Sequence, residues 1–159
     1  MATDKRAVAL AMAVALAVPA EGLRTWAYDD IADPKLLTVC YGHTGADVTR
    51  TRSYSLDECK SLLDKDMLYA ISVVEQCRAG LPPAVLAAFS DAVFNMGPTI
   101  ACNTGKSTAA RMLAAGDFVA ACRQLPRWSR ASFAGVSIEL PGLVKRRAAE
   151  MAVCLHGAI

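Results

Sequence analysis

Apolar residues recur along most of this 159-residue chain at the three- and four-residue spacing that is typical of amphipathic helices. The longest apolar stretch without a charge is AVALAMAVALAVPA, residues 7–20, and it predicts a helix over residues 5–20. Residues 55–58, Ser-Leu-Asp-Glu, have the pattern of a capping box. The periodic apolar positions behind them predict a second helix that ends near residue 76.

The second half of the chain continues the helical pattern. We expect a very apolar, central helix over residues 84–96, short helices capped by Ser107 and Asp117, and a final helix from Pro141 to about His156, with a loop before it. By contrast, residues 25–45 combine aromatic and β-branched residues with turn signals and predict a small antiparallel sheet. The pattern predicts one α+β domain over residues 1–159, with a helical lobe and a small N-terminal sheet lobe.

Composition and charge restrict the possible partners. With 54% hydrophobic and 20% charged residues, the chain has the composition of a globular protein. A net charge of +2 is too small to indicate nucleic-acid binding, so we expect no nucleic-acid partner, and we expect a monomer. Basic residues gather towards the C-terminus. We interpret residues 145–147, Lys-Arg-Arg, as part of a surface ion network with Glu150, or else as a surface that contacts an acidic wall polymer.

The cysteines indicate an oxidising compartment. There are six, scattered and without a CxxC pair, and only two histidines accompany them, so we expect neither a metal site nor a cofactor. Up to three disulfides fit this pattern. Of the 15 pairings that six cysteines allow, shared neighbourhoods favour Cys40–Cys59, Cys77–Cys102 and Cys122–Cys154.

The N-terminal segment has two interpretations. Fourteen apolar residues are short for a bilayer, which needs about 20. The segment resembles the apolar region of a signal peptide, yet cleavage after Ala20 would leave Glu21 without a helix to hold it. One hypothesis is that residues 1–20 enter a membrane and leave it again. The other is that they form a core helix that is apolar all round.

Carboxylates at the end of this segment are the candidate chemistry. Glu21 follows an apolar helix, where a half-buried glutamate favours its protonated form and could act as a general acid. Asp30 lies in a wetter strand–turn setting and should stay ionised, and the Thr38 hydroxyl on the next strand could help to hold a water. Two carboxyl groups in different environments are what glycoside hydrolysis requires, although the spacing alone is a weak signal.

The surrounding motifs strengthen this hypothesis. Glu21-Gly-Leu-Arg, Tyr28-Asp-Asp30 and Thr38-Val-Cys-Tyr-Gly-His43 resemble the active-site segment of phage-type lysozymes, glycoside hydrolase family 24, which carry a Glu–Asp–Thr triad. The chain resembles in particular the lambdoid-phage endolysins that have a signal-arrest-release (SAR) N-terminus. Later motifs agree, among them Phe94-Asn-Met-Gly97 and the run Gly142-Leu-Val-Lys-Arg-Arg-Ala-Ala-Glu150.

The resemblance implies an endolysin that cleaves peptidoglycan between N-acetylmuramic acid and N-acetylglucosamine. Glu21 would be the general acid, with Asp30 and Thr38 directing water in an inverting mechanism. The substrate groove would lie between the lobes, with Asn95 near its wall. Residues 1–20 would tether the enzyme to the host inner membrane until a phage holin triggers its release into the periplasm. The alternative location is the host cytoplasm until holin action.

One departure from the family pattern concerns the aspartate. Seven residues, 31–37, separate Asp30 from Thr38, where the family usually has five, so Asp29 competes with Asp30 for the role. Asp30 keeps the family's spacing from Glu21 and is our choice. Two other functions stay open: lytic transglycosylation, which needs no second carboxylate, and an inactive protein that binds the wall or docks on the membrane.

Aromatic residues and a histidine near these motifs have more modest interpretations. Tyr28 and Trp26 could stack on sugar rings, although we expect core packing for both. We interpret His43 as a structural residue that holds its strand, and not as a catalytic base.

Overall fold

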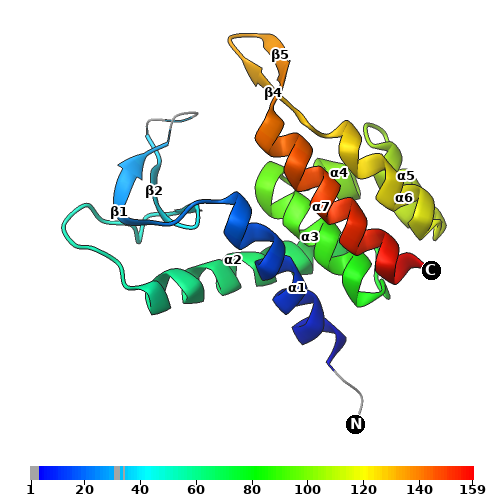
Figure 1. Cartoon of the computed structure of the whole chain (residues 1–159), viewed down its shortest axis with the longest axis horizontal. Coiled ribbons are helices and arrows are strands. Elements are labelled where there is room, and N and C mark those ends of the chain that lie inside the picture. The colour runs from blue at the N-terminus through cyan, green and yellow to red at the C-terminus, as the bar shows by residue number, and fades with distance from the viewer. Residues whose placement is uncertain (1–3, 31–32, 34) are drawn as a thin grey trace.

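The structure, a computed structural model, describes residues 4–30, 33 and 35–159 of the chain. A compact group of helices lies on one side and a small sheet on the other, and α2 (Leu56–Cys77) runs from beneath the sheet into the helices (Figure 1). The expected α+β architecture with two lobes is confirmed. The helical lobe and the sheet lobe each have an apolar core of their own.

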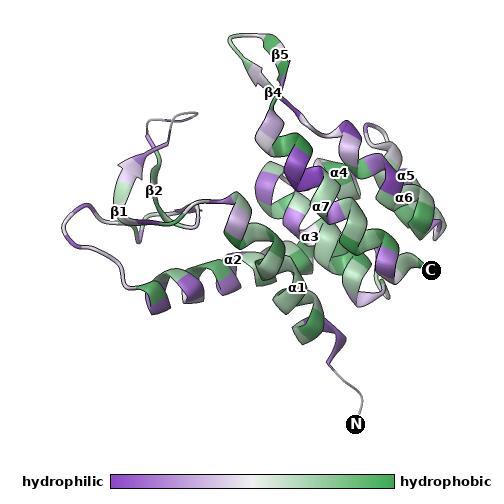
Figure 2. Cartoon of the chain, viewed as in Figure 1, coloured by the Kyte–Doolittle hydropathy of each residue, from purple (hydrophilic) through white to green (hydrophobic). Residues whose placement is uncertain are grey.

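Helix α3 (Pro83–Met96) is the centre of the helical lobe. Every residue from position 84 to 93 is buried, and α3 packs against α1 (Lys5–Ala20), α2 and α7 (Pro141–Ala158). Figure 2 shows the hydrophobic colour along α3 and α1. At the end of α7, a Cβ on Gly157 would come within 2.5 Å of the Ala84 Cβ, so the two helices approach closely there. The expected central helix is confirmed.

The expected N-terminal helix is present and packs into the core. Asp4 caps α1 by accepting a hydrogen bond from the Arg6 backbone amide, which occupies a donor that would otherwise lack an intrahelical partner. Ala9, Ala13 and Ala17 are buried one helical turn apart and turn the same face toward the lobe. Small side chains allow the helix to lie close to α3.

Helix α2 joins the lobes. Its capping box is complete: the Ser55 hydroxyl accepts from the Glu58 amide, and the Glu58 carboxylate accepts from the Ser55 amide at 2.7 Å. Buried positions then repeat at helical spacing: Cys59, Leu63, Met67, Ala70, Ile71 and Val74. The remaining short elements close the helical lobe: α4 (Thr99–Cys102), α5 (Thr108–Ala115), α6 (Phe118–Gln124) and the 3-10 helix η1 (Leu125–Arg127).

The small sheet is antiparallel and follows chain order. It contains β1 (Arg24–Asp29), β2 (Leu37–Cys40) and β3 (His43–Thr44). Tyr28 lies opposite Thr38, and Thr38 lies opposite Thr44. Residues that lie directly opposite each other point to the same face of a sheet, so these three side chains share one face.

All six cysteines lie among the described residues, and they form the three disulfides expected from the sequence. Cys40–Cys59 joins the sheet to the start of α2, Cys77–Cys102 joins the end of α2 to α4, and Cys122–Cys154 joins α6 to α7. Each disulfide therefore links two different elements covalently.

The sequence analysis missed a hairpin. Residues expected to form a loop form β4 (Arg130–Phe133) and β5 (Val136–Glu139), which project from the helical lobe (Figure 1). All four residues of β5 are exposed, and Phe133 and Val136 are among the exposed apolar side chains. The two strands do alternate polar and apolar residues, as Arg-Ala-Ser-Phe and Val-Ser-Ile-Glu around an Ala-Gly turn, so a local signal for a hairpin was present in the sequence.

Candidate active site

A cavity of about 550 Å³ lies where the sheet lobe meets the helical lobe. Gly42 and Thr44 line it from the sheet side. From the opposite side it is lined by residues of α2 and by Phe94, Gly97 and Pro98 at the end of α3. Lys65 and Tyr69, the latter 73% exposed, extend the wall along α2 and were not identified from the sequence. The expected groove between the lobes is therefore present.

Glu21 lies at the edge of this cavity. It is the C-cap residue of α1, with its backbone amide bonded to the Ala17 carbonyl, so the helix sets where its side chain begins. Its carboxyl reaches the turn between β2 and β3, because a Cβ on Gly42 would lie only 3.2 Å from Glu21 Oε2. Gly42 has a φ of +78°, so both the backbone and this contact favour glycine there.

Arg146 contacts the same carboxyl group. Its Nη1 donates to Glu21 Oε1 at 2.6 Å, and the Glu21 side chain is 23% exposed. Glu21 is half-buried at the end of an apolar helix, as expected, and its carboxyl is bonded to a cation that the sequence analysis did not foresee. The sequence analysis placed the Arg146 side chain on the surface, whereas it is 5% exposed in the structure.

The surface interpretation of residues 145–147 holds for the exposed Lys145 and is wrong for Arg146 and Arg147. Arg147 and Glu150 are fully buried, and Arg147 Nη2 donates to Glu150 Oε1 at 2.7 Å. Asp91 on α3 accepts two hydrogen bonds from Arg146. The signal in the sequence was a lone acid, Asp91, within an otherwise apolar helix, which requires a buried cation as its partner.

Asp30 and Thr38 lie on neighbouring segments of the sheet. Asp30 follows β1 directly, and its amide donates to the Leu36 carbonyl at 3.1 Å, which continues the pairing of the two strands. By strand alternation, Asp30 points to the same face as Tyr28 and therefore as Thr38. Thr44 shares this face and lines the cavity, whereas Asp30 and Thr38 are not themselves among the lining residues.

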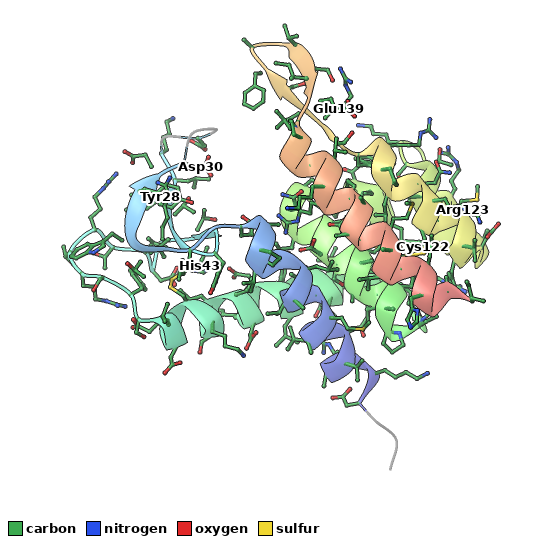
Figure 3. All side chains as sticks on the ribbon, viewed as in Figure 1. Tyr28, Asp30, His43, Cys122, Arg123 and Glu139 are labelled. Atoms are coloured by element: carbon green, nitrogen blue, oxygen red, sulfur yellow. A yellow bond between two sulfur atoms is a disulfide. The ribbon has the colours of Figure 1, made fainter. Side chains whose placement is uncertain are left out.

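Asp29 is placed differently. Alternation puts its side chain on the other face of the sheet, where Arg50 donates to its carboxylate. Asp29 is also more than half exposed. Figure 3 shows Tyr28 and Asp30 in the sheet lobe near the end of β1. Of the extra segment before Thr38, residues 31, 32 and 34 lie outside the described residues.

Thr38 is 3% exposed, and its hydroxyl has no hydrogen-bond partner among the residues that the structure describes. A buried hydroxyl loses its hydration, at a cost of about 1–3 kcal/mol when nothing replaces it. The arrangement therefore favours a bound water or ligand group next to Thr38.

The predicted substrate-binding residues have mixed settings. The Asn95 carboxamide oxygen accepts from Arg147 Nη2 at 2.8 Å, and its neighbour Phe94 lines the cavity. Tyr28 is partly buried, and the Arg24 guanidinium lies 4.3 Å from its ring centre. Core packing was the wrong expectation for Trp26, which is 58% exposed.

His43 has the structural role expected for it. It is buried on the opposite face from Thr38, where Nδ1 bonds Asp66 of α2 at 2.7 Å and Nε2 bonds Asp47 at 3.0 Å. Burial disfavours the charged imidazolium, but these two carboxylates outweigh it and raise the pKa of His43. The histidine thus attaches β3 to α2.

Neither a metal cluster nor a membrane span is found in the parts of the chain that the structure describes. Within residues 4–30, 33 and 35–159, no three His, Cys, Asp or Glu side chains are grouped so as to hold a metal ion. Over the same residues, no helix has the length and apolar character needed to cross a membrane; α1 has 16 residues.

Comparisons with known proteins agree with this geometry. Residues 19–150 match the protein family described as phage lysozyme. The SAR-endolysin of Bacteriophage PS119 is 38% identical over 138 residues, which cover 86% of this chain and 77% of the relative.

Two solved structures of one endolysin, in its active and inactive forms, differ in their similarity to this fold. The active form of the P1 phage endolysin Lyz superimposes with a TM-score of 0.76 at 25% identity, covering 93% of this chain and 85% of the other. The secreted inactive form of that endolysin superimposes with a TM-score of only 0.52, at 26% identity, over 72% of this chain and 78% of the other. The fold described above is therefore more similar to the active form.

Proposed function

Because this chain belongs to the phage lysozyme family of peptidoglycan-degrading glycoside hydrolases, we propose that Glu21 is its general acid in hydrolysis of the N-acetylmuramic acid–N-acetylglucosamine β-1,4 bond. The observation that carries the proposal is the position of Glu21. Its carboxyl lies at the edge of the cavity between the lobes, over Gly42. A glycan strand in this cavity would bring a glycosidic oxygen to that carboxyl.

Protonation of the leaving oxygen requires a neutral Glu21 before bond cleavage. Arg146 contacts Glu21, but the same guanidinium also binds the buried Asp91. The charge of Arg146 is thus already balanced by one carboxylate, and Glu21 does not face an isolated cation. Because Arg146 is shared between Asp91 and Glu21, Glu21 can be neutral before it protonates the leaving oxygen and charged afterwards, as a general acid requires.

Asp30 and Thr38 would direct the attacking water. Their side chains share one sheet face with Thr44, which lines the cavity, and the Thr38 hydroxyl, which has no partner among the described residues, supports a water position there. Asp29 is the weaker candidate because it points away from this face and binds Arg50. Water attack from the side opposite to the leaving group gives inversion at the anomeric carbon.

Asn95 and Tyr28 are the proposed substrate-binding residues. Asn95 stands beside the cavity residue Phe94, and Tyr28 is on the same face as Thr38. Peptidoglycan offers both amide groups and sugar rings to such residues. The reaction assigned here uses side chains only and needs no cofactor.

The proposal is tested by one single variant and one matched pair of variants. Glu21→Gln should remove nearly all lysis of permeabilised cells while circular dichroism shows a folded protein. Asp30→Asn should lose far more activity than Asp29→Asn, since only Asp30 shares the face of Thr38. Near-native lysis by Glu21→Gln would exclude the general acid role, and equal effects at positions 29 and 30 would exclude the choice of Asp30.

Product analysis distinguishes hydrolysis from the two rival functions. Mass spectrometry should find muramyl products with a reducing end. Products 18 Da lighter on the muramyl sugar would indicate a lytic transglycosylase instead. Saccharide binding without any product would indicate an inactive wall-binding protein.

We further propose that residues 1–20 act as a SAR segment, which holds the enzyme at the host inner membrane until a holin acts and the enzyme is released into the periplasm. The relatives named SAR-endolysins support this hypothesis. So does α1, an apolar helix that ends at Ala20, directly before Glu21, and packs through small residues. Fractionation of infected cells should find the chain with the inner membrane before lysis and soluble, at unchanged length, afterwards. Finding only cytoplasmic protein before lysis would restore the alternative of a plain core helix.

A further inference from the structure

Asp91 is a fully buried carboxylate in the middle of the most apolar helix of the protein. A charge is stable in such surroundings only when a partner and hydrogen bonds compensate its lost hydration. Arg146 from α7 supplies both: Nε donates to Asp91 Oδ2 at 3.0 Å, and Nη2 donates to Oδ1 at 2.7 Å. These two parallel bonds fix the plane of the guanidinium as well as its position.

The third nitrogen of the same guanidinium is therefore aimed in a set direction. Arg146 Nη1 meets Glu21 Oε1 at 2.6 Å. Because a guanidinium is planar and rigid, the two bonds to Asp91 determine where Nη1 lies and hence where the Glu21 carboxyl is held. Asp91, on α3, thus acts on Glu21, on α1, through a residue of α7.

A second group of ion pairs and hydrogen bonds adjoins Arg146. Arg147 Nη2 donates both to Glu150 Oε1 and to Asn95 Oδ1, while Glu150 Oε1 lies 3.8 Å from Arg146 Nε. Burial, with the Asp91 carboxyl beside it, raises the pKa of Glu150 to about 10. The charge of Arg146 is balanced by the buried carboxylate of Asp91.

We propose that Asp91 is a positioning residue for Glu21, acting through the bidentate hydrogen bonds that orient Arg146. The proposal rests on the role of Glu21 as general acid. Asp91 has no exposed surface and does not itself contact substrate. Its effect is on the geometry of the acid and on the charge that Arg146 presents to it.

The first test is Asp91→Asn. The amide cannot accept both bonds, so the guanidinium loses its fixed orientation and its charge is less well balanced. We expect kcat to fall roughly 10- to 100-fold, as for a displaced catalytic group, with KM unchanged. The alkaline limb of the kcat–pH profile should move to lower pH, because an unbalanced Arg146 favours the charged form of Glu21. Asp64→Asn, which removes a surface ion pair with Lys60, is the control and should behave like wild type.

The second test is the double variant Asp91→Leu/Arg146→Met, which removes both charges and leaves neither partner alone in the core. Such replacements are often tolerated by the fold. Here kcat should also fall, but the alkaline limb should move to higher pH, since Glu21 has lost its cation. If Asp91 had only a structural role, the alkaline limb of the kcat–pH profile would not move in opposite directions in the two variants.

The outcomes separate this proposal from the one on which it depends. If Glu21→Gln is inactive while folded Asp91→Asn keeps the wild-type kcat and pH profile, the positioning role is wrong and the general acid stands. A fall in kcat without any movement of the limb in either variant also contradicts the positioning role. If Glu21→Gln is fully active, the general acid assignment itself fails.

Discussion

The carboxyl of Glu21 lies against the backbone of Gly42: a Cβ at position 42 would come 3.2 Å from Glu21 Oε2. This contact joins the end of α1 to the β2–β3 turn and so brings the two lobes together at the proposed acid. Position 42 also has a φ of +78°, where a side chain is strained by about 1–2 kcal/mol.

Replacing this glycine should therefore affect activity more than stability. Gly42→Ala should lower kcat roughly tenfold or more, because the new methyl group displaces the Glu21 carboxyl. Gly135→Ala is a matched control: its φ is +80°, but a Cβ there meets nothing within 4 Å. Both variants should lose similar free energy of unfolding. Equal kcat values for the two would show that the contact with Glu21 is irrelevant.

Packing of α1 can be separated from its attraction to a membrane. Ala13→Leu should destabilise the released enzyme by about 1–3 kcal/mol, because Ala13 is fully buried and an added side chain overpacks the core. Ala15→Leu makes the same change in hydropathy on an exposed position of α1 and should not destabilise.

Membrane fractionation of the two leucine variants completes this comparison. Both should be retained at the inner membrane for longer than wild type, since both raise the apolar character of residues 1–20 equally. Retention of Ala13→Leu alone would mean that docking of α1, and not its hydropathy, controls release.

Stability should depend on the protonation of His43. The pKa of His43 is raised in the folded state by its ion pairs with Asp66 and Asp47. These pairs therefore stabilise the fold fully below the unfolded pKa of about 6.5. Their contribution to the free energy of unfolding is lost as pH rises through the higher folded pKa. Urea unfolding of wild type and His43→Gln should therefore differ most near pH 6 and less at pH 9. A difference that grows with pH would contradict this assignment.

The Cys122–Cys154 disulfide should contribute to stability and not to chemistry. Its cysteines are 32 positions apart, which corresponds to about 3–4 kcal/mol of chain-entropy stabilisation. Replacing both by alanine should lower the unfolding free energy by that order, measured in guanidinium, while kcat at 25 °C stays near wild type. A large loss of kcat in the folded double variant would instead connect α6 to the active site.

Most helices and the small sheet could be predicted from the sequence because their signals are local. The capping box at Ser55 and Glu58 and the periodic apolar positions behind it depend on neighbours within a turn or two. The β4–β5 hairpin also has a local signal, because Arg-Ala-Ser-Phe and Val-Ser-Ile-Glu alternate polar and apolar residues around an Ala-Gly turn, and it was overlooked.

The candidate site divides in the same way. The sequence alone, through the order of its motifs, indicated the family and the residues Glu21, Asp30 and Thr38. Tertiary structure decided which face Asp30 and Asp29 occupy, because that depends on pairing with β2. It also decided that Arg146 and Glu150 are buried next to Asp91, 55 positions from Arg146 in the chain. Burial and long-range ion pairs are properties of helices packed together, and no local pattern contains them.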